Sequence, residues 1–354
     1  MAIEIRPFGG DAEELAAFVT RHWQIQYKND GYAPVLSRDY FRWMMPSFAA
    51  GDPSSIIAAY QGGTLLGVMP SDPLPIKLKG RPAITLAREY LTVHSERLRG
   101  GIGRMLREGL AARSREIGAR FATGFVNSTG LVGKGRNFWN SMADRTIVLK
   151  RPRQWIRVLN GPKVSVAMYD YFDRVSAWVG GILGKPMGKR DYSGHVRPYR
   201  PTDLSACHRI FTDHMEGFDL AYRWDEKRLG HHLEFSGLPT TLVYDDSGGA
   251  ITGFATCYVF EVNGRRAMRN AIIDMGAPQG MKFSQKVSLL SSTIAEARAQ
   301  DAHLAIVLGP PVNSAAVLLA KRFVPVPTSY HLLLAVFDAE PALKNVRRPF
   351  AIFR

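Results

Sequence analysis

The stretch of residues 90–120 constrains the fold of this chain most, because it reads as a strand, a glycine-rich turn and an amphipathic helix in that order. Leu91 and Val93 alternate with Tyr90 and Thr92, which is the period-two pattern of a strand. After the turn, apolar residues recur at helical spacing, namely Ile102, Met105, Leu106, Leu110 and Ile117. A strand that leads through glycines into a helix predicts a loop of accessible backbone N–H groups at the helix start.

The turn itself contains Gly100, Gly101 and Gly103, with Arg99 and Arg104 beside them. Glycines at a helix start let the backbone N–H groups close around an anion, and the helix dipole adds positive potential there. The arginines supply further donors for phosphate oxygens. The turn lacks the Gly-Lys-Ser/Thr ending of a P-loop and the glycine spacing of a dinucleotide fold. It predicts a different kind of pyrophosphate-binding loop, and the alternative is a surface turn that only caps the helix.

These residues resemble the acyl-CoA-binding motif of the GNAT N-acyltransferase superfamily, which reads Val-His-Pro-x-x-Arg-Gly-x-Gly-x-Gly in many members. Val93 to Glu96 match the strand exit, and Gly101 to Gly103 match the end of the loop. Leu98 stands where the family has Arg or Gln, so the side-chain contacts differ while the backbone cradle is kept. The resemblance implies that acyl-CoA binds as a co-substrate, with no permanently bound cofactor, at Leu91, Thr92, Val93, Arg99, Gly100, Gly101, Ile102, Gly103, Arg104 and Asn127.

Asn127 belongs to that set because it follows the strand expected at residues 121–126. In the family, an Asn at this place contacts the pantetheine arm of CoA where two strands splay apart. A side-chain amide is both donor and acceptor, and therefore suits the amides of that arm. An Asn that simply turns the chain out of a strand is the alternative interpretation.

The order of the elements along the chain is that of a GNAT domain. The expected elements are a strand at 3–6, a helix from Asp11, a hairpin of 55–60 with 65–69, and strands at 74–78 and 84–93. Residues 24–50 are rich in aromatic side chains, which predicts short helices over a binding groove or, equally, core packing.

The pattern restarts at His195, where Val196-Arg-Pro echoes Ile5-Arg-Pro before a second capped helix. We therefore expect an α/β fold with a mixed sheet, built from two tandem GNAT-like folds. The expected units are an N-terminal domain with the acyl-CoA site (1–150), a linker (151–194), a second GNAT-like domain (195–340) and a basic tail (341–354). The stretch from Gly276 to Phe283 has few glycines, and Pro278 removes one donor, so only the first copy is expected to hold CoA.

The linker departs from any plain acetyltransferase. Apolar and aromatic residues between 164 and 183 fall on one helical stripe, and basic residues flank it from 150 to 163 and from 185 to 190. An apolar stripe between basic flanks is typical of a helix that lies in a membrane interface. The alternative is an inter-domain helix whose stripe packs against the protein itself.

Composition limits the partners and the compartment. The 354 residues carry a formal net charge of +15 and only two cysteines. This balance favours a polyanionic partner, such as a phosphorylated cofactor or an anionic membrane surface through residues 150–190, and it excludes a disulfide framework. No basic run interleaved with exposed aromatics is present, so nucleic acid is not expected as a partner. Without a signal segment, spanning stretch or metal-ligand cluster, we expect a cytoplasmic chain without a metal site, free or peripheral on the inner face of the membrane.

Three residues are candidates for the catalytic base. An ammonium cannot attack a thioester, so an N-acyltransferase needs a group that takes the proton from the amine. Many family members carry this base on the strand before the cradle, where Glu89 lies here. His94 at the strand exit and Asp274 on the matching strand of the second copy are the other candidates. A salt-bridged glutamate and a structural histidine are the plain alternatives.

The doubled fold resembles the N-myristoyltransferases in architecture, and the superfamily also includes bacterial ceramide synthases. The resemblance implies a transferase that moves an acyl group, from acyl-CoA or acyl carrier protein, to a primary amine. A long acyl chain and a lipid acceptor such as a sphingoid base fit the basic surface and the amphipathic linker. A protein or small-molecule acetyltransferase is the second hypothesis. A catalytically inactive double-GNAT protein that binds nucleic acid is the third.

Overall fold

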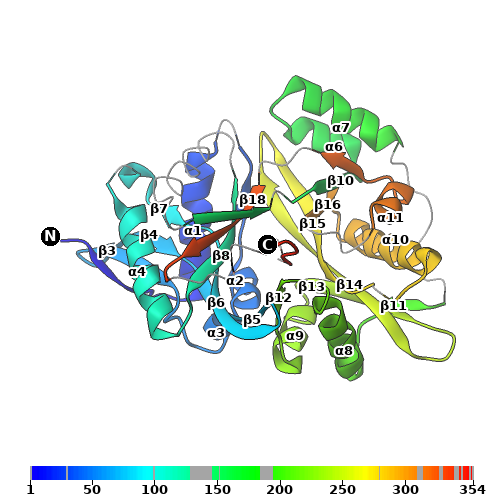
Figure 1. Cartoon of the computed structure of the whole chain (residues 1–354). Coiled ribbons are helices and arrows are strands. Elements are labelled where there is room, and N and C mark those ends of the chain that lie inside the picture. The colour runs from blue at the N-terminus through cyan, green and yellow to red at the C-terminus, as the bar shows by residue number, and fades with distance from the viewer. Residues whose placement is uncertain are drawn as a thin grey trace.

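The computed structural model of the chain describes residues 2–28, 31–98, 100–127, 146–150, 152–183, 194–278, 280–308, 314–326, 330–338, 343, 346–350 and 352. It is a mixed α/β fold of three β-sheets with helices on their faces (Figure 1). The predicted fold class is confirmed.

The strands are β1 (Glu4–Pro7), β2 (Ala33–Val35), β3 (Ile57–Gln61), β4 (Thr64–Met69), β5 (Ser71–Leu78), β6 (Arg81–Arg88), β7 (Thr92–Val93), β8 (Phe121–Asn127), β9 (Thr146–Lys150), β10 (Gln154–Val158), β11 (Val196–Pro198), β12 (Leu220–Tyr222), β13 (Pro239–Asp245), β14 (Ile251–Asn263), β15 (Ala267–Gly276), β16 (Leu304–Leu308), β17 (Val324–Val326) and β18 (Tyr330–Val336). The helices are α1 (Ala12–Gln26), α2 (Arg38–Met44), α3 (Pro46–Ala49), α4 (Ile102–Glu116), α6 (Gly161–Ala167), α7 (Tyr171–Leu183), α8 (Leu204–Met215), α9 (Glu226–Leu233), α10 (Phe283–Ala299) and α11 (Ala315–Ala320), with short 3₁₀ turns η1 (Ser95–Arg97) and η4 (Pro201–Asp203).

The first half of the chain builds a sheet that splits in two. One part has the strand order β1-β3-β4-β7, and the other has the order β12-β5-β6-β8-β18-β9. The chain passes from one part to the other twice: β4 leads through Pro70 into β5, and β6 leads through three residues into β7. Helix α1 starts as predicted, because the Asp11 side chain accepts hydrogen bonds from the N–H groups of Glu13 and Glu14 at 2.9 Å.

The second half builds one eight-stranded sheet in the order β11-β13-β14-β15-β16-β10-β17, with β2 also paired to β14. Alternation along the strands separates its two faces. One face packs against α10 and α11 through Cys257, Ile273 and Val307. The other face turns Tyr258, Ile272 and other apolar residues towards the first half.

Strands cross between the halves in both directions, because β12 and β18 join the sheet of the first half while β2 and β10 join the sheet of the second. In the first half, β18 from the end of the chain lies between β8 and β9. In the second half, β10 from the middle of the chain holds the corresponding place between β16 and β17. The sheets therefore do not follow the boundaries expected at residues 150 and 195, and that division of the chain into units stays a prediction.

The linker also differs from the single helical stripe expected over residues 164–183, because the chain forms two helices there. α6 ends at Met168, whose backbone is extended, and α7 starts at Tyr171. Two glycines let these helices touch: a Cβ on Gly181 would lie 2.4 Å from the Cα of Gly161. None of the helices in the described ranges is long and apolar enough to cross a membrane.

Candidate functional site

The predicted cradle is the start of α4. Gly101 precedes this helix with a left-handed backbone (φ 75°), and no side chain caps it. The Gly101 carbonyl accepts the first intrahelical bonds, from the N–H groups of Arg104 at 3.0 Å and Met105 at 3.1 Å. In a first helical turn the N–H groups of Ile102 and Gly103 have no intrahelical acceptor, and they remain available to an anion.

The arginines of the loop contribute less than the backbone. The exposed Arg104 guanidinium pairs with Glu108 at 2.9 Å, and Arg99 lies outside the described residues. The second copy shows the contrast, because the main-chain N–H of Lys282 at the start of α10 donates to the Gln285 side chain at 2.7 Å. This hydrogen bond satisfies the N–H of the N-cap residue of α10, whereas no side chain caps the start of α4. That only the first copy holds CoA stays a prediction.

Two histidines lie beneath the cradle. His94 accepts the N–H of Glu96 at 3.4 Å, and its ring contacts that of His22 in a tilted arrangement, with centroids 4.4 Å apart. His22 accepts the N–H of Ser95 at 3.2 Å, which ties α1 to the loop. Burial, together with the nearby His94 and Arg21, lowers the pKa of His22 from 6.5 to about 4. His94 thus supports the loop in this structure, and it is not among the residues that line the cavity described below.

Glu89 and Tyr90 lie where the strand breaks. The parallel pairing of β6 with β8 covers only Leu86 and Ala87, and it does not continue to Glu89 and Tyr90. Tyr90 adopts φ 49°, a left-handed conformation that costs energy for a bulky residue and clusters at functional sites. The Glu89 N–H donates to the Pro70 carbonyl at 3.1 Å, and the Glu89 side chain is half-buried at the cavity.

Aromatic residues hold this break in place. The hydroxyls of Tyr40 and Tyr90 are 2.7 Å apart, and burial raises the pKa of Tyr90 well above its usual value. The Trp23 indole donates to the Thr92 hydroxyl at 2.9 Å, which in turn donates to the Tyr90 carbonyl at 2.7 Å. Leu91 packs against the core that includes Ile102. The aromatic residues from the 24–50 region therefore pack in the core and also line the cavity.

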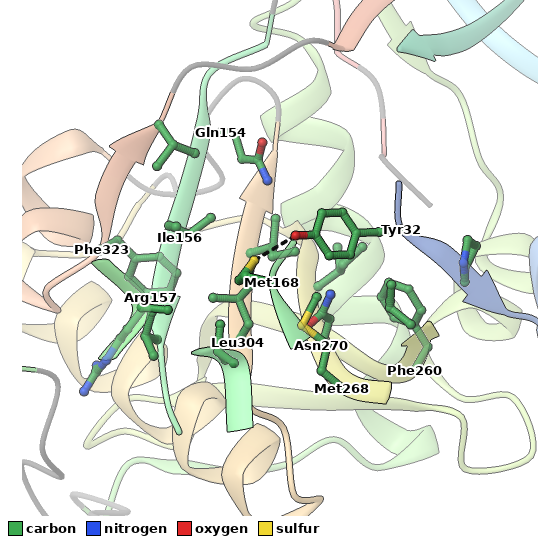
Figure 2. Close-up of a pocket in the computed structure, with 18 of the residues that line it drawn as sticks. Tyr32, Gln154, Ile156, Arg157, Met168, Phe260, Met268, Asn270, Leu304 and Phe323 are labelled. Carbon is green, nitrogen blue, oxygen red and sulfur yellow. Dashed lines mark hydrogen bonds between the residues drawn. The ribbon is translucent and has the colours of Figure 1, made fainter. Parts of the chain in front are cut away.

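A cavity of about 1050 Å³ extends from this break across the second sheet (Figure 2). Glu89, Tyr90, Phe125 and Tyr330 border it at the splayed strands. Its floor is made of alternate residues on four neighbouring strands, namely Tyr258, Phe260, Val262, Met268, Asn270, Ile272, Leu304, Ile306, Ile156 and Val158. Residues of α6 and α7, from Val164 to Gly180, form its outer wall.

Polar side chains are a minority in the cavity lining. Asn270 is one, and the Tyr32 hydroxyl is another, bonded to the Met168 sulfur at 2.9 Å. Arg157 also borders the cavity, near Arg298 and Arg322, and burial and these two cations lower its pKa to about 10. Sequence reasoning did not single out Asn270 and Arg157, whose only signal is a polar residue inside an apolar strand pattern. Tyr32 belongs to the aromatic stretch 24–50, for which a binding groove is one of the two expectations.

The remaining predicted residues lie apart from this cavity or at its edge. Asp274 is 3% exposed, at a bulge of β15 that shifts the register against Thr256 and Cys257, and does not line the cavity. The backbone of Asn127 ends β8 and pairs with Tyr330, while residues 128–139 lie outside the described residues. Within the described ranges no group of three or more potential metal ligands occurs.

No protein-family model and no curated protein sequence matches the chain. Its fold matches solved structures. The crystal structure of Saccharomyces cerevisiae N-myristoyltransferase with bound myristoyl-CoA is 13% identical with a TM-score of 0.74, covering 96% of this chain and 84% of the yeast chain. The structure of the yeast enzyme with bound myristoyl-CoA and inhibitors is also 13% identical with a TM-score of 0.74, and it covers 96% of this chain and 81% of the yeast chain. A GCN5-related N-acetyltransferase from Kribbella flavida is 13% identical with a TM-score of 0.54, covering 98% of this chain and 74% of the other.

At this identity the likeness concerns the fold alone. The chain has a mixed α/β fold like that of the yeast N-myristoyltransferase, and it also matches the fold of the GCN5-related N-acetyltransferase, as the sequence predicts. The uncapped helix start and the broken strand with Glu89 lie in the first half, and the apolar cavity extends from that break across the second sheet.

Proposed function

We propose that this chain is an acyl-CoA-dependent N-acyltransferase that transfers a long acyl chain to the primary amine of an amphiphile, such as a sphingoid base. The cavity is the observation that carries the proposal. It is as large as the sites that bury whole drug-sized ligands, and apolar side chains dominate its lining. An acetyl group and a small polyamine would leave most of this space empty, whereas hydrocarbon chains would fill it.

The donor would bind in the first half. Its diphosphate would lie against the N–H groups of Ile102 and Gly103, where the helix dipole favours negative charge. From there β7 leads back towards Tyr90, so an extended arm that follows this strand would bring the thioester to the break beside Glu89. β7 and β8 belong to different sheets and do not pair, so the arm would lie along β7 at the junction of the two sheets.

Glu89 is the base that the geometry favours among the three candidates. It borders the cavity next to the strand break, whereas His94 and Asp274 do not line the cavity. Its carboxylate would take the proton from the ammonium, and the free amine would then attack the thioester carbon. The carbonyl oxygen becomes negative in that step, and a main-chain N–H at the broken strand would stabilise it. The C–S bond then breaks, leaving the amide and the CoA thiol.

Two alternatives concern the partners of the same reaction. An acyl carrier protein is strongly acidic as a class, and the net charge of +15 would attract it to the same cradle. An anionic membrane surface would suit an amphiphilic acceptor. Val166 on α6 and Val175 and Trp178 on α7 are 53%, 43% and 54% exposed at the outer wall of the cavity. The basic residues at 185–190 lie outside the described residues.

The decisive experiment offers matched donors and acceptors to the purified chain. Acetyl-, octanoyl-, myristoyl- and stearoyl-CoA are each combined with sphinganine, octadecylamine or spermine, and the released thiol and the amide product are measured. We expect product from long-chain donors with the two amphiphilic amines. Product from acetyl-CoA with spermine alone would support the acetyltransferase instead, and no heat of binding with any thioester would contradict the enzymatic proposal altogether.

A further inference from the structure

One polar side chain stands in the middle of the otherwise apolar cavity floor. Asn270 lies on β15, directly opposite Phe260 on β14 and Leu304 on β16. Along its own strand the neighbours on the same face are Met268 and Ile272, because side chains alternate between the faces of a sheet. Figure 2 shows Asn270 among these residues, with the carboxamide at the cavity.

The carboxamide is buried without satisfying its acceptor. Asn270 is 5% exposed, and its Oδ1 has no hydrogen-bond partner among the described residues. A buried amide oxygen left without a donor costs free energy, and a leucine of similar size would avoid that cost and complete the apolar floor. An orphaned acceptor at the centre of a ligand-sized cavity therefore points to a donor that arrives with the ligand.

A second polar group faces the same part of the cavity. The Tyr32 hydroxyl donates to the Met168 thioether, which is a weak acceptor, at 2.9 Å. Its oxygen keeps acceptor capacity, and the bond is easily exchanged for a stronger one. Met168 and Met268 belong to one apolar cluster, so Tyr32 and Asn270 border the same segment of the cavity.

We propose that Asn270, assisted by Tyr32, binds a hydroxyl group on the hydrocarbon chain that occupies the cavity, and so selects a hydroxylated chain over a plain one. A hydroxyl donates one hydrogen bond and accepts others, which matches the orphaned Oδ1 and the donors of the two side chains. A site built to bond a hydroxyl discriminates strongly, because a ligand that lacks it leaves the buried groups unpaired. This inference rests on the proposed function. The hydroxyl has two sources, the acyl chain or the long-chain amine.

Equilibrium binding tests the proposal without requiring turnover, and Trp23 in the cavity wall provides a fluorescence signal. Two matched pairs separate the sources: 3-hydroxymyristoyl-CoA against myristoyl-CoA, and sphinganine against octadecylamine. We expect the wild type to bind the hydroxylated member of one pair about tenfold more tightly, the effect of one well-placed hydrogen bond. The pair that discriminates identifies the molecule that occupies the cavity.

Asn270→Leu should bind the hydroxylated and the plain member of that pair about equally, because it should lose affinity only for the hydroxylated ligand. Asn263→Leu removes a carboxamide at the end of β14, where the residue does not line the cavity, and as the matched control it should keep the preference. Asn270→Leu should also unfold at an equal or higher temperature than the wild type without ligand. Should it fail to fold, Asn270→Ala takes its place.

Wild-type indifference in both pairs overturns the inference, as does a preference that survives Asn270→Leu. The proposed function fails separately. If the protein discriminates between the hydroxylated and the plain chain but makes no amide, the proposed enzymatic function is contradicted and the hydroxyl-binding site is supported. An active enzyme that does not discriminate contradicts only the site.

Discussion

Among single residues, Glu89 has the most demanding role in the proposed reaction, because proton removal must precede the attack of the amine. Glu89→Gln keeps the shape of the side chain and removes its basicity. We expect kcat to fall by about 10²- to 10³-fold while the affinity for acyl-CoA stays unchanged, since the cradle lies at the other end of β7. Steady-state kinetics together with donor titration measure both quantities.

The matched control for this change is Glu96→Gln in the 3₁₀ turn η1, which lies in the loop and not at the cavity. It removes the same charge from the same half of the protein and should leave kcat within about twofold of the wild type. Full activity of Glu89→Gln would move the base to another group and would leave the cradle untouched.

His22 predicts how the site responds to acid. Its pKa is about 4 in the folded protein and 6.5 ordinarily, so between these values the unfolded chain binds more protons. Stability from this group is therefore complete above pH 6.5 and is lost as the pH falls towards 4, by at most about 3 kcal/mol. Thermal unfolding of the wild type and of His22→Gln, recorded from about pH 7.5 to about pH 4.5, measures this loss of stability. The range begins about one unit above the ordinary pKa of 6.5 and ends near the folded value of about 4. Parallel curves for the two proteins would contradict the assignment.

Some residues of the site were accessible from sequence and others were not. Glu89 and the cradle glycines are local, because the strand, the loop and the helix follow one another within about thirty residues. Asn270, Tyr32 and Arg157 come from three distant segments that meet only after the sheets form. A polar residue in a strand says nothing by itself about the cavity it will face.

At the scale of elements, the start of α4 is the part whose chemistry is easiest to test. Gly101→Asp puts a negative charge beside the N–H groups that would hold the diphosphate. A Cβ at Gly101 meets no atom within 4 Å, and Asp tolerates a left-handed backbone better than most residues, so the fold should survive. We expect the CoA affinity to fall by about tenfold or more, measured by calorimetry.

Gly101→Asn separates charge from backbone strain, because its side chain has nearly the same shape and also tolerates positive φ. It should weaken CoA binding far less than the aspartate does. Equal losses in the two variants would show that backbone conformation, and not the electrostatics of the helix start, sets the affinity. Unchanged affinity in both would contradict the cradle.

The elements themselves were largely predictable, and the exceptions have physical causes. Capping by Asp11, the glycine turns of the hairpins and the period of α4 are local signals, and the structure follows them. The stripe over residues 164–183 was read as one helix because apolar spacing continues across its break. The contact between Gly161 and Gly181 folds the two helices against each other, and such a contact leaves no trace in periodicity.

At the scale of the whole molecule, the exchange of β10 and β18 predicts that the halves depend on each other. A fragment of residues 1–152 lacks β18, so β8 and β9 would lose the strand that pairs with both. We expect this fragment alone to be unfolded or aggregated, and a mixture with residues 153–354 to recover the native circular dichroism and a 1:1 complex on gel filtration. Cooperative unfolding of the isolated fragment would contradict this expectation.

Sequence patterns could not reveal that exchange. The doubled order of strands and helices is visible along the chain, but a last strand reads the same whether it joins its own sheet or the neighbouring one. Which strands pair over a long sequence separation depends on which sheet edges are still unpaired as the chain folds. The doubled fold was therefore predictable, and the path by which the two copies interlock was not.

The interlocked sheets also limit the conformational changes that the molecule can make. Beyond the crossed strands, Arg228 of α9 pairs with Asp72 of β5 at 2.5 Å, and Trp43 donates to the His232 carbonyl at 3.1 Å. Because these contacts and the shared strands tie the two halves together, we do not expect the halves to separate as rigid bodies about a hinge. In the proposed reaction the amide product would leave the cavity past α6 and α7, and its release would then limit the turnover rate.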